Sequence, residues 1–318
     1  MTILLAPMEG LLDHSLRDVL TRVGGIDRCV SEFIRITDQL LPERVFIRLM
    51  PELLSGSRTA AGVPVRAQLL GSDAACLADN AALLATLRPE GIDLNFGCPA
   101  KTVNRHRGGA ALLGEPELLN EIASAVRAVV PVDMPFTAKM RLGIDDTGLA
   151  VECAQALAAG GIDELIVHGR TKLDGYRPPA RWMWIDKLRA EVAIPIIANG
   201  EVWTVDDFVR CQHETGCADI MLGRGAVADP LLARRARGEA VGGWAAIVPG
   251  VAIYWCGVRQ KVVPEHAGGR LKQWLALLRF NYPEAGELYQ RLRPIKAAQD
   301  IDAALVAAGI LDELPLAA

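Results

Sequence analysis

The sequence of 318 residues is poor in aromatic side chains, which make up 5% of it, and it has no excess of positive charge. Its 34 Lys and Arg stand against 38 Asp and Glu, so the formal net charge is −4. A histone-like polycation is therefore excluded, and a nucleic-acid partner would require a local basic face. The 30 Gly and 18 Pro residues also stay well below the roughly 25–30% that is typical of low-complexity chains. With 51% hydrophobic residues, the chain is expected to be globular.

Cysteine pairs, leader-like segments and metal clusters are also scarce. The seven cysteines include no CxxC pair, and the N-terminus does not read as a signal peptide, so we expect reduced thiols and a cytoplasmic protein. The uncharged stretch 240–258 is interrupted by Gly242-Gly243 and Pro249-Gly250, which favours a loop and a buried helix over a membrane span. Cys211-x-His213-x₃-Cys217 has a metal-like spacing, but it falls on a predicted helix and its exit, so we expect no metal.

Short apolar runs alternate with loops and longer helical stretches through the first 225 residues, which is typical of a parallel sheet. The expected strands are 3–6, 29–33, 63–70, 92–96, 136–140, 165–168, 194–198 and 220–222. Helices are expected at 74–87, 118–129 and 205–214 from their caps and Ala/Leu spacing. Residues 43–49 are compatible with an extra strand or an extra helix. Eight strands in this alternation predict a closed (β/α)₈ TIM barrel.

The alternation stops after Arg224, and the remaining pattern is helical, at 230–237, 244–263, 269–280, 283–291 and 299–308. We therefore predict two domains, a TIM barrel over 1–240 and a smaller all-helical domain over 241–318. Between Arg259 and Lys296, eight basic residues face only three acidic ones. This charge is compatible with a nucleic-acid-binding face and with an ordinary solvated face.

Functional side chains of a TIM barrel follow the C-terminal ends of its strands. Polar or reactive residues occupy these positions here, namely Gln68, Asn95, Cys98, Lys139, Arg141, His168, Asn199, Glu201 and Arg224. Gly200 and Gly223 follow the last two strands, where this fold usually binds phosphate, and they allow backbone N–H groups to approach a ligand closely. Arg224 adds a charged fork for the same phosphate.

Three of these side chains have more than one interpretation. Lys139 could be a Schiff-base nucleophile, a cation beside a flavin or a phosphate, or an interior ion-pair partner, and the neighbouring amides favour a flavin. Cys98 lies at the tip of a loop and could act as an acid or as a nucleophile. His168 is compatible with a core imidazole or with a ligand contact.

Six motifs in order resemble the tRNA-dihydrouridine synthases over nearly the whole chain. They are Ala6-Pro7-Met8-Glu9-Gly10, 93–99 followed by Lys101-x-Val103, Lys139-Met140-Arg141-Leu142-Gly143, His168-Gly169-Arg170-Thr171, Asn199-Gly200 and Gly223-Arg224-Gly225. Within that family, Ser31-Glu32-Phe33-Ile34-Arg35 and the run 269–275 are similar to the bacterial C-type members, which act on the uridine at D-loop position 16.

The resemblance implies an FMN-binding barrel, reduced by NADPH, that hydrogenates the 5,6 double bond of a tRNA uridine. It implies that Cys98 is the general acid. It implies further that the FMN is held by Pro7, Met8, Gln68, Lys139, His168, Asn199, Gly200, Glu201, Gly223 and Arg224. Contacts to the tRNA would come from Arg35, Asn95, Lys101, Arg141, Tyr176, Lys272, Trp274, Arg279 and Arg293. The helical domain would then bind the tRNA body through its phosphates, and such a face suits a monomer.

Two alternatives keep parts of this interpretation. An FMN-dependent barrel acting on a small free pyrimidine, as dihydroorotate dehydrogenases do, would need no basic helical tail. An RNA-binding module with an inactive flavin site would not need Cys98 and Lys139 together with the phosphate loops. The tail and the intact strand ends therefore favour a tRNA uridine reductase.

Overall fold

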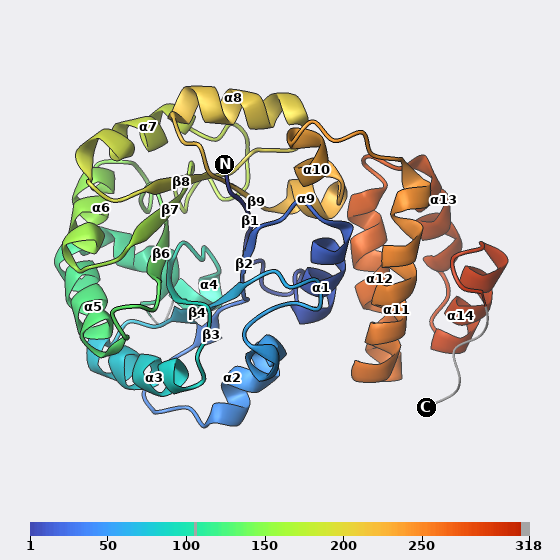
Figure 1. The fold of residues 1–318 in the computed structure, drawn as a ribbon, viewed down its shortest axis with the longest axis horizontal. Helices are drawn as coiled ribbons and strands as arrows, with labels where there is room; N and C mark the ends of the chain where they lie inside the picture. The colour runs from blue at the N-terminus through green and yellow to red at the C-terminus, as the bar shows by residue number, and fades with distance from the viewer. Residues whose placement is uncertain (105–106, 313–318) are drawn as a thin grey trace.

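The computed structural model describes residues 1–104 and 107–312, and its centre is a closed barrel of parallel strands (Figure 1). The strands are β1 (Ile3–Leu5), β2 (Arg28–Val30), β3 (Ile34–Arg35), β4 (Val65–Leu70), β5 (Ile92–Phe96), β6 (Phe136–Arg141), β7 (Glu164–His168), β8 (Ile196–Asn199) and β9 (Ile220–Leu222). The sheet closes where β2 pairs with β4, while β3 pairs with β4 alone. Eight strands thus form the wall, which confirms the predicted TIM barrel.

The second barrel strand is shorter than the predicted 29–33, because the ladder is interrupted at Ser31. Its backbone N–H still donates to the carbonyl of Arg66, but its hydroxyl accepts from the backbone N–H of Gln68 at 3.1 Å. The chain then forms the two-residue strand β3. The undecided segment 43–49 is the helix α2 (Glu43–Leu49), which is followed by the short 3₁₀ helix η1 (Pro51–Ser55).

Helices surround the barrel, and the predicted ones are confirmed within one or two residues. They are α1 (His14–Val23), α3 (Ala74–Thr86), α4 (Lys101–Asn104), α5 (Pro116–Val129), α6 (Ala150–Ala159), α7 (Trp182–Glu191), α8 (Val205–Thr215), α9 (Arg224–Ala228) and α10 (Leu232–Ala236), with the 3₁₀ turn η2 (Gly109–Gly114). The caps act as expected: the Asp73 carboxylate accepts from Cys76 N–H, and Thr204 forms a capping box with Asp207.

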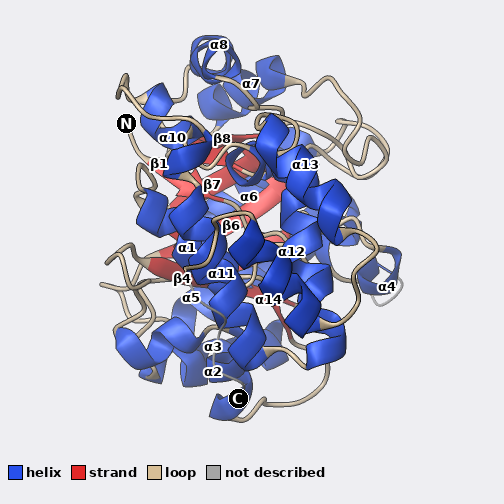
Figure 2. Ribbon diagram, turned by 90° about the vertical axis from the view of Figure 1, so that its right-hand side faces the viewer, coloured by secondary structure: helices blue, strands red, loops and turns tan. Residues whose placement is uncertain are grey.

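The helical region after residue 243 contains η3 (Trp244–Ala246), α11 (Val248–Lys261), α12 (Pro264–Leu278), α13 (Pro283–Leu292) and α14 (Ala298–Ala307). It packs on one side of the barrel (Figures 1 and 2), where α11 contacts α1 and α12 contacts α9. The predicted helix 244–263 is wrong at its start, because residues 244–246 form the separate turn η3 and α11 begins at Val248 with Pro249 in its first turn. The predicted helix 269–280 is also wrong at its start, because α12 begins five residues earlier with Pro264 in its first turn. In the described part of the chain, no helix has the length and apolarity needed to cross a bilayer.

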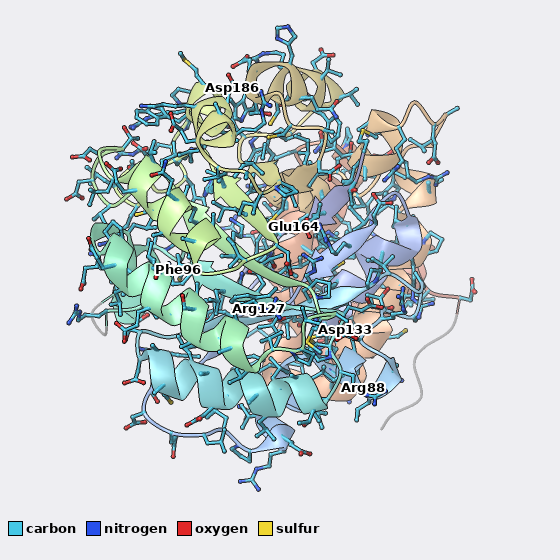
Figure 3. The ribbon with its side chains drawn as sticks, turned by 60° about the vertical axis from the view of Figure 1, so that its left-hand side comes forward. Arg88, Phe96, Arg127, Asp133, Glu164 and Asp186 are labelled. Atoms are coloured by element: carbon cyan, nitrogen blue, oxygen red, sulfur yellow. The ribbon has the colours of Figure 1, made fainter. Side chains whose placement is uncertain are left out.

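An ion-pair network closes the N-terminal end of the barrel. Glu164 begins β7 and accepts two hydrogen bonds of 2.8 Å from the guanidinium of Arg28, at the start of β2. Arg66 of β4 donates a third at 2.7 Å. Figure 3 shows Glu164 at this end of the barrel. Burial alone would raise the pKa of Glu164, but the hydrogen bonds from Arg28 and the charge of Arg66 lower it overall. The carboxylate therefore joins three strands that are not all neighbours in the sheet.

Replacing Glu164 with Gln should destabilise the protein at neutral pH by about 3 kcal/mol, because two half-buried guanidinium groups lose their carboxylate. The lowered pKa means that this contribution is complete above the ordinary pKa of about 4.5 and is lost as the pH falls through the lower folded value. Urea unfolding at pH 7 and pH 3.5 should show a gap between variant and wild type that shrinks in acid. Glu121→Gln, on the exposed face of α5, serves as the matched control, and equal stability of all three proteins at pH 7 would contradict the expectation.

Candidate functional site

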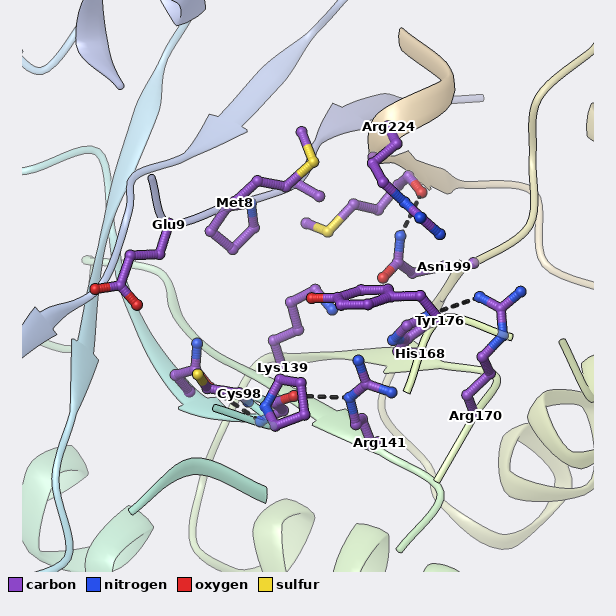
Figure 4. Close-up of a pocket in the computed structure, with 18 of the residues that line it drawn as sticks. Met8, Glu9, Cys98, Lys139, Arg141, His168, Arg170, Tyr176, Asn199 and Arg224 are labelled. Carbon is purple, nitrogen blue, oxygen red and sulfur yellow. Dashed lines mark hydrogen bonds between the residues drawn. The ribbon is translucent and has the colours of Figure 1, made fainter. Parts of the chain in front are cut away.

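A cavity of about 550 Å³ opens at the C-terminal ends of the barrel strands (Figure 4). Its volume is within the range of about 300–1,000 Å³ that is usual for small-molecule sites. The structure brings all ten residues expected to hold a cofactor into its lining, which are Pro7, Met8, Gln68, Lys139, His168, Asn199, Gly200, Glu201, Gly223 and Arg224. Cys98, Asn95, Arg141 and Tyr176 line the same cavity. Strand ends that are far apart in the sequence thus meet at one site.

A chain of buried amides runs through the wall beneath Cys98. The Asp93 carboxylate accepts from Thr137 Oγ1 and from Gln68 Nε2, each at 2.6 Å. Gln68 Oε1 in turn accepts from Asn95 Nδ2 at 2.7 Å. Asn95 Oδ1 accepts from the backbone N–H groups of Gly97 and Cys98 at 3.0 and 2.9 Å. Asn95 therefore holds the loop that carries Cys98, a role that the sequence did not reveal.

The Cys98 thiol lies half-buried in a loop that is fixed on both sides. Its carbonyl accepts from Asn104 Nδ2 at 2.9 Å and from Ala110 N–H at 3.1 Å. A Cβ at Gly109 would lie 2.9 Å from that carbonyl oxygen, and Gly109 has φ +61°, so glycine is required there. Burial raises the pKa of the thiol, partly opposed by the hydrogen bond from Ala100 N–H. The group is therefore protonated at neutral pH and can donate a proton.

Lys139 projects from β6 into the base of the cavity, at the same level as Asn95 on β5. Burial and, to a smaller extent, the charge of Arg141 lower its pKa to about 7, while Asp93 opposes the shift. The ammonium is thus close to half-charged at neutral pH and would gain its full charge when an anionic group approaches. A pKa near neutrality suits a lysine whose charge depends on a bound ligand. It suits a permanent ion pair in the interior less well.

His168 and Arg170 form the far wall of the cavity at the end of β7. Arg170 Nη1 lies 3.3 Å from His168 Nε2, and its guanidinium also pairs with Glu201. Burial lowers the pKa of His168 well below its ordinary value, and the surrounding arginines add to the shift. The imidazole is therefore neutral and accepts from Arg170. A Cβ at Gly200 would lie 2.6 Å from His168 Cδ2, so the β8 loop can approach the imidazole only as glycine.

Close to His168 and Arg170, the cavity has a glycine-rich cradle with a fixed cation. Arg224 follows Gly223, and its guanidinium lies 4.7 Å from the ring centre of Tyr176 and 5.1 Å from that of Trp203. A Cβ on Gly225 would lie 2.1 Å from the carbonyl oxygen of Val202, so α9 packs against the neighbouring loop without a side chain there. Two aromatic rings thus hold a cation next to the glycines that follow β9, an arrangement that suits a phosphate.

These features fit the FMN that the sequence motifs imply. The amide of Gln68 and the ammonium of Lys139 lie on one side of the cavity, while the cradle of Gly223 and Arg224 lies on another. A flavin ring needs hydrogen-bonding groups along its pyrimidine edge, and its phosphate needs the cradle. Asn199 is held in place by the bond from its Nδ2 to the carbonyl of Met221 at 2.8 Å.

The residues expected to contact RNA fall into different surroundings. Arg141 and Tyr176 are adjacent in the cavity, with the guanidinium carbon 5.3 Å from the ring centre. The Nε and Nη1 groups of Arg141 donate to the carbonyls of Gly97, Thr171 and Gly175, which fixes the guanidinium in the cavity. Arg35 and Lys101 lie outside the cavity lining, and Arg35 donates to the carbonyl of Thr102 at 3.4 Å.

The helical region contains one clear correction. Trp274 is fully buried, and its indole N–H donates to the carbonyl of Val227 at 3.1 Å, so a direct contact with RNA is wrong for this side chain. The Lys272 ammonium is also engaged internally, because it donates to the carbonyls of Ile295 and Arg293. Arg279 and Arg293 are exposed and remain accessible.

Sequence reasoning placed Arg170 at a strand end beside His168 without giving it a role, and it missed Trp203 as part of the site. Arg170 is a fully buried cation between His168 and Glu201, and Trp203 holds Arg224. Trp203 follows the end of β8 by four residues, and that position was its only available signal. In the described part of the chain, no three His, Cys, Asp or Glu side chains converge as metal ligands.

Known proteins similar to this chain agree with the motifs. A model of the dihydrouridine synthase family matches residues 4–243. The tRNA-dihydrouridine(16) synthase of Aquipseudomonas alcaligenes is 54% identical over 308 residues, which cover 95% of this chain and 98% of that protein. The protein of the same name from Pseudomonas putida is 56% identical over 299 residues, or 92% and 93% of the two chains.

Solved structures resemble the chain in fold alone. A 2-naphthoyl-CoA reductase complex has a TM-score of 0.56 at 14% identity, covering 74% of this chain and 50% of that one. An old yellow enzyme homologue from Zymomonas mobilis has a TM-score of 0.50 at 13% identity, covering 75% and 89%.

Lys139→Met should raise the stability of the cofactor-free protein at pH 7, because a buried ammonium with a lowered pKa destabilises the fold. The lysine of the unfolded chain keeps its proton up to about pH 10.5. The cost is therefore complete below pH 7 and fades between pH 7 and 10.5. Thermal midpoints of variant and wild type should converge between pH 7 and 9.5, whereas exposed Lys296→Met should follow the wild type throughout. A gap independent of pH would contradict this assignment.

Proposed function

Because the chain belongs to the dihydrouridine synthase family, we propose that it reduces the C5=C6 bond of the uridine at position 16 of tRNA, with FMN as cofactor and NADPH as reductant. The observation that carries this proposal is the placement of one protonated thiol, Cys98, in the same cavity as a flavin-type set of amides and cations. The names of the two relatives, both tRNA-dihydrouridine(16) synthases, support the tRNA substrate and the position of the uridine.

The cofactor would be held along the strand ends. Pro7 and Met8 would contact the flavin through their backbone, while Gln68 and Lys139 would bind its pyrimidine edge. His168 would lie against the ring, and the segment 199–201 would hold the ribityl chain. Gly223 and Arg224 would bind the phosphate. When bound, the FMN supplies the hydride that is added to C6 of the uracil.

Cys98 is placed to supply the proton that completes the reduction at C5. Its raised pKa keeps the thiol protonated, and its fixed loop keeps the sulfur in the cavity. Proton donation leaves a thiolate, which Arg141 and Arg35 stabilise through their charges, since both lower the pKa of the thiol. The residues therefore allow donation without making the thiol acidic at rest.

The uracil would be held by polar and aromatic groups around Cys98. Arg141 offers its guanidinium, and Tyr176 offers a ring that is 56% exposed. Asn95 can contribute through the second hydrogen of its Nδ2, since the first is used by Gln68. The target base has to leave the folded tRNA to enter the cavity, as in other enzymes that modify bases in a pocket.

We assign the tRNA body to the helical region and the rim of the barrel. Residues 1–240 would form the cofactor unit and residues 241–318 the tRNA-binding unit. Exposed Arg279 and Arg293 on the helical region, with Arg35 and Lys101 at the rim, would contact phosphates. A basic surface of this kind has no role for a small free pyrimidine, so the tRNA substrate is favoured. The monomeric state and the cytoplasmic location proposed from the sequence accord with this substrate.

The Cys98→Ala variant should bind FMN as the wild type does and lose at least about 100-fold of its turnover, because the proton donor is gone. The direct measurement is dihydrouridine at each tRNA position in a strain that lacks this protein, complemented with either form. We expect the wild type to restore dihydrouridine at position 16 and the variant to leave uridine there. Cys256→Ala, in the helical region, is the matched control. Full restoration by Cys98→Ala would remove the assigned acid, and restoration at another position would revise the target.

A further inference from the structure

We propose that helix α12 is a positioning element of the cofactor pocket, which it braces through Arg270, Gln273 and Trp274. This inference rests on the proposed function, because the pocket is the one assigned to FMN. The three residues belong to the run 269–275 that sequence reasoning connected with RNA binding. In the structure they point to the barrel, where they hold the two loops that follow β1 and β9.

The first loop is held at Gly10. The carbonyl of Gly10 accepts from Arg270 Nη1 at 2.9 Å and from Gln273 Nε2 at 3.0 Å. Its N–H donates to Glu32 Oε1 at 2.6 Å, so both backbone groups of this glycine are occupied. Arg270 also pairs with Asp13, the residue that caps α1. The backbone of Gly10 is thus bound from two sides by side chains distant in sequence.

Gly10 lies inside a turn that is closed by Met8. The carbonyl of Met8 accepts from the N–H groups of Leu11 and Leu12 at 3.1 and 2.8 Å. Gly10 has φ +73°, which glycine adopts without strain. Fixing Gly10 therefore fixes Met8 and Pro7, which line the cavity. α12 acts on the cofactor side of the pocket through this turn.

The second loop is held at α9. Trp274 is fully buried and donates to the carbonyl of Val227, in the helix that begins directly after Gly223. Asn281, just beyond α12, donates to the carbonyl of Ala228 at 3.0 Å. Strands β1 and β9 are neighbours in the barrel, so one helix reaches both loops (Figure 1). The loop after β1, assigned to the flavin ring, and the loop after β9, assigned to the phosphate, are thus both supported by α12.

This arrangement makes cofactor binding and the position of the helical region interdependent. A ligand that shifts α12 changes the pocket, and FMN in the pocket stabilises α12 against the barrel, because such coupling is reciprocal. Arg270 and Gln273 act through Gly10, so they are positioning residues and not cofactor contacts.

The test is the affinity for FMN of Arg270→Ala/Gln273→Ala, measured by quenching of flavin fluorescence with the full chain. We expect the double variant to bind FMN about tenfold more weakly and Gln273→Ala alone about threefold more weakly. Hydrogen exchange of the amides in 8–12 should be faster in the cofactor-free double variant than in the wild type. Arg291→Ala, an exposed arginine on α13, is the matched control for lost charge.

If α12 braces the pocket, the side chains that hold Gly10 should affect FMN binding without affecting RNA binding. Arg270→Ala should leave the salt dependence of tRNA affinity unchanged, whereas Arg293→Ala should reduce its slope by about one. A folded double variant with FMN affinity within twofold of wild type and unchanged exchange would overturn the brace. If the double variant does not fold, Gln273→Ala decides, since that side chain is exposed. A wild type that binds no FMN would refute the proposed function, while the exchange measurement would still test the brace.

Discussion

The site depends on the direction of hydrogen bonding in the buried amide chain that joins Asp93 to the Cys98 loop. A backbone N–H only donates, so the end of the chain at Gly97 and Cys98 permits one polarity. Gln68 must therefore turn its NH₂ group to Asp93, and Asn95 must turn its oxygen to the loop. A side-chain amide is nearly symmetric in shape, and its partners alone decide its orientation. The position of the thiol is thus linked through two side-chain amides to the buried carboxyl group of Asp93.

The cavity also contains side chains that lower the stability of the fold but suit the chemistry of the site. Lys139 and His168 lie close to Arg141, Arg170 and Arg224, and burial with mutual repulsion lowers the pKa values of the lysine and the histidine. Such a concentration of positive charge is unfavourable unless an anion joins it. The glycine cradle and the arginine held by Tyr176 and Trp203 provide the place for that anion. The positive charge of the site would therefore be balanced when an anionic cofactor is bound.

The strand ends could be predicted from the sequence because βα alternation places them at one face of the barrel, whatever the details of packing. Gln68, Lys139 and Asn199 were found in this way. The role of Trp274 could not be predicted, since an apolar face and an RNA-facing aromatic look alike in a basic helix. The part played by Asn95 was hidden for another reason, because its partners are backbone N–H groups that carry no residue signature. The start of α11 was misplaced because Pro249 is compatible with a first turn as well as with a break.

The ion-pair network of Glu164 with Arg28 and Arg66 bears on the order in which ligands can enter the cavity. It closes the end of the barrel opposite the cavity with charged side chains that are themselves linked across strands. A bound cofactor would be approached from the open mouth alone. Under the proposed function, the reductant and the tRNA would have to use this one entrance, so each would leave before the other arrives, and the two halves of the reaction would alternate in time.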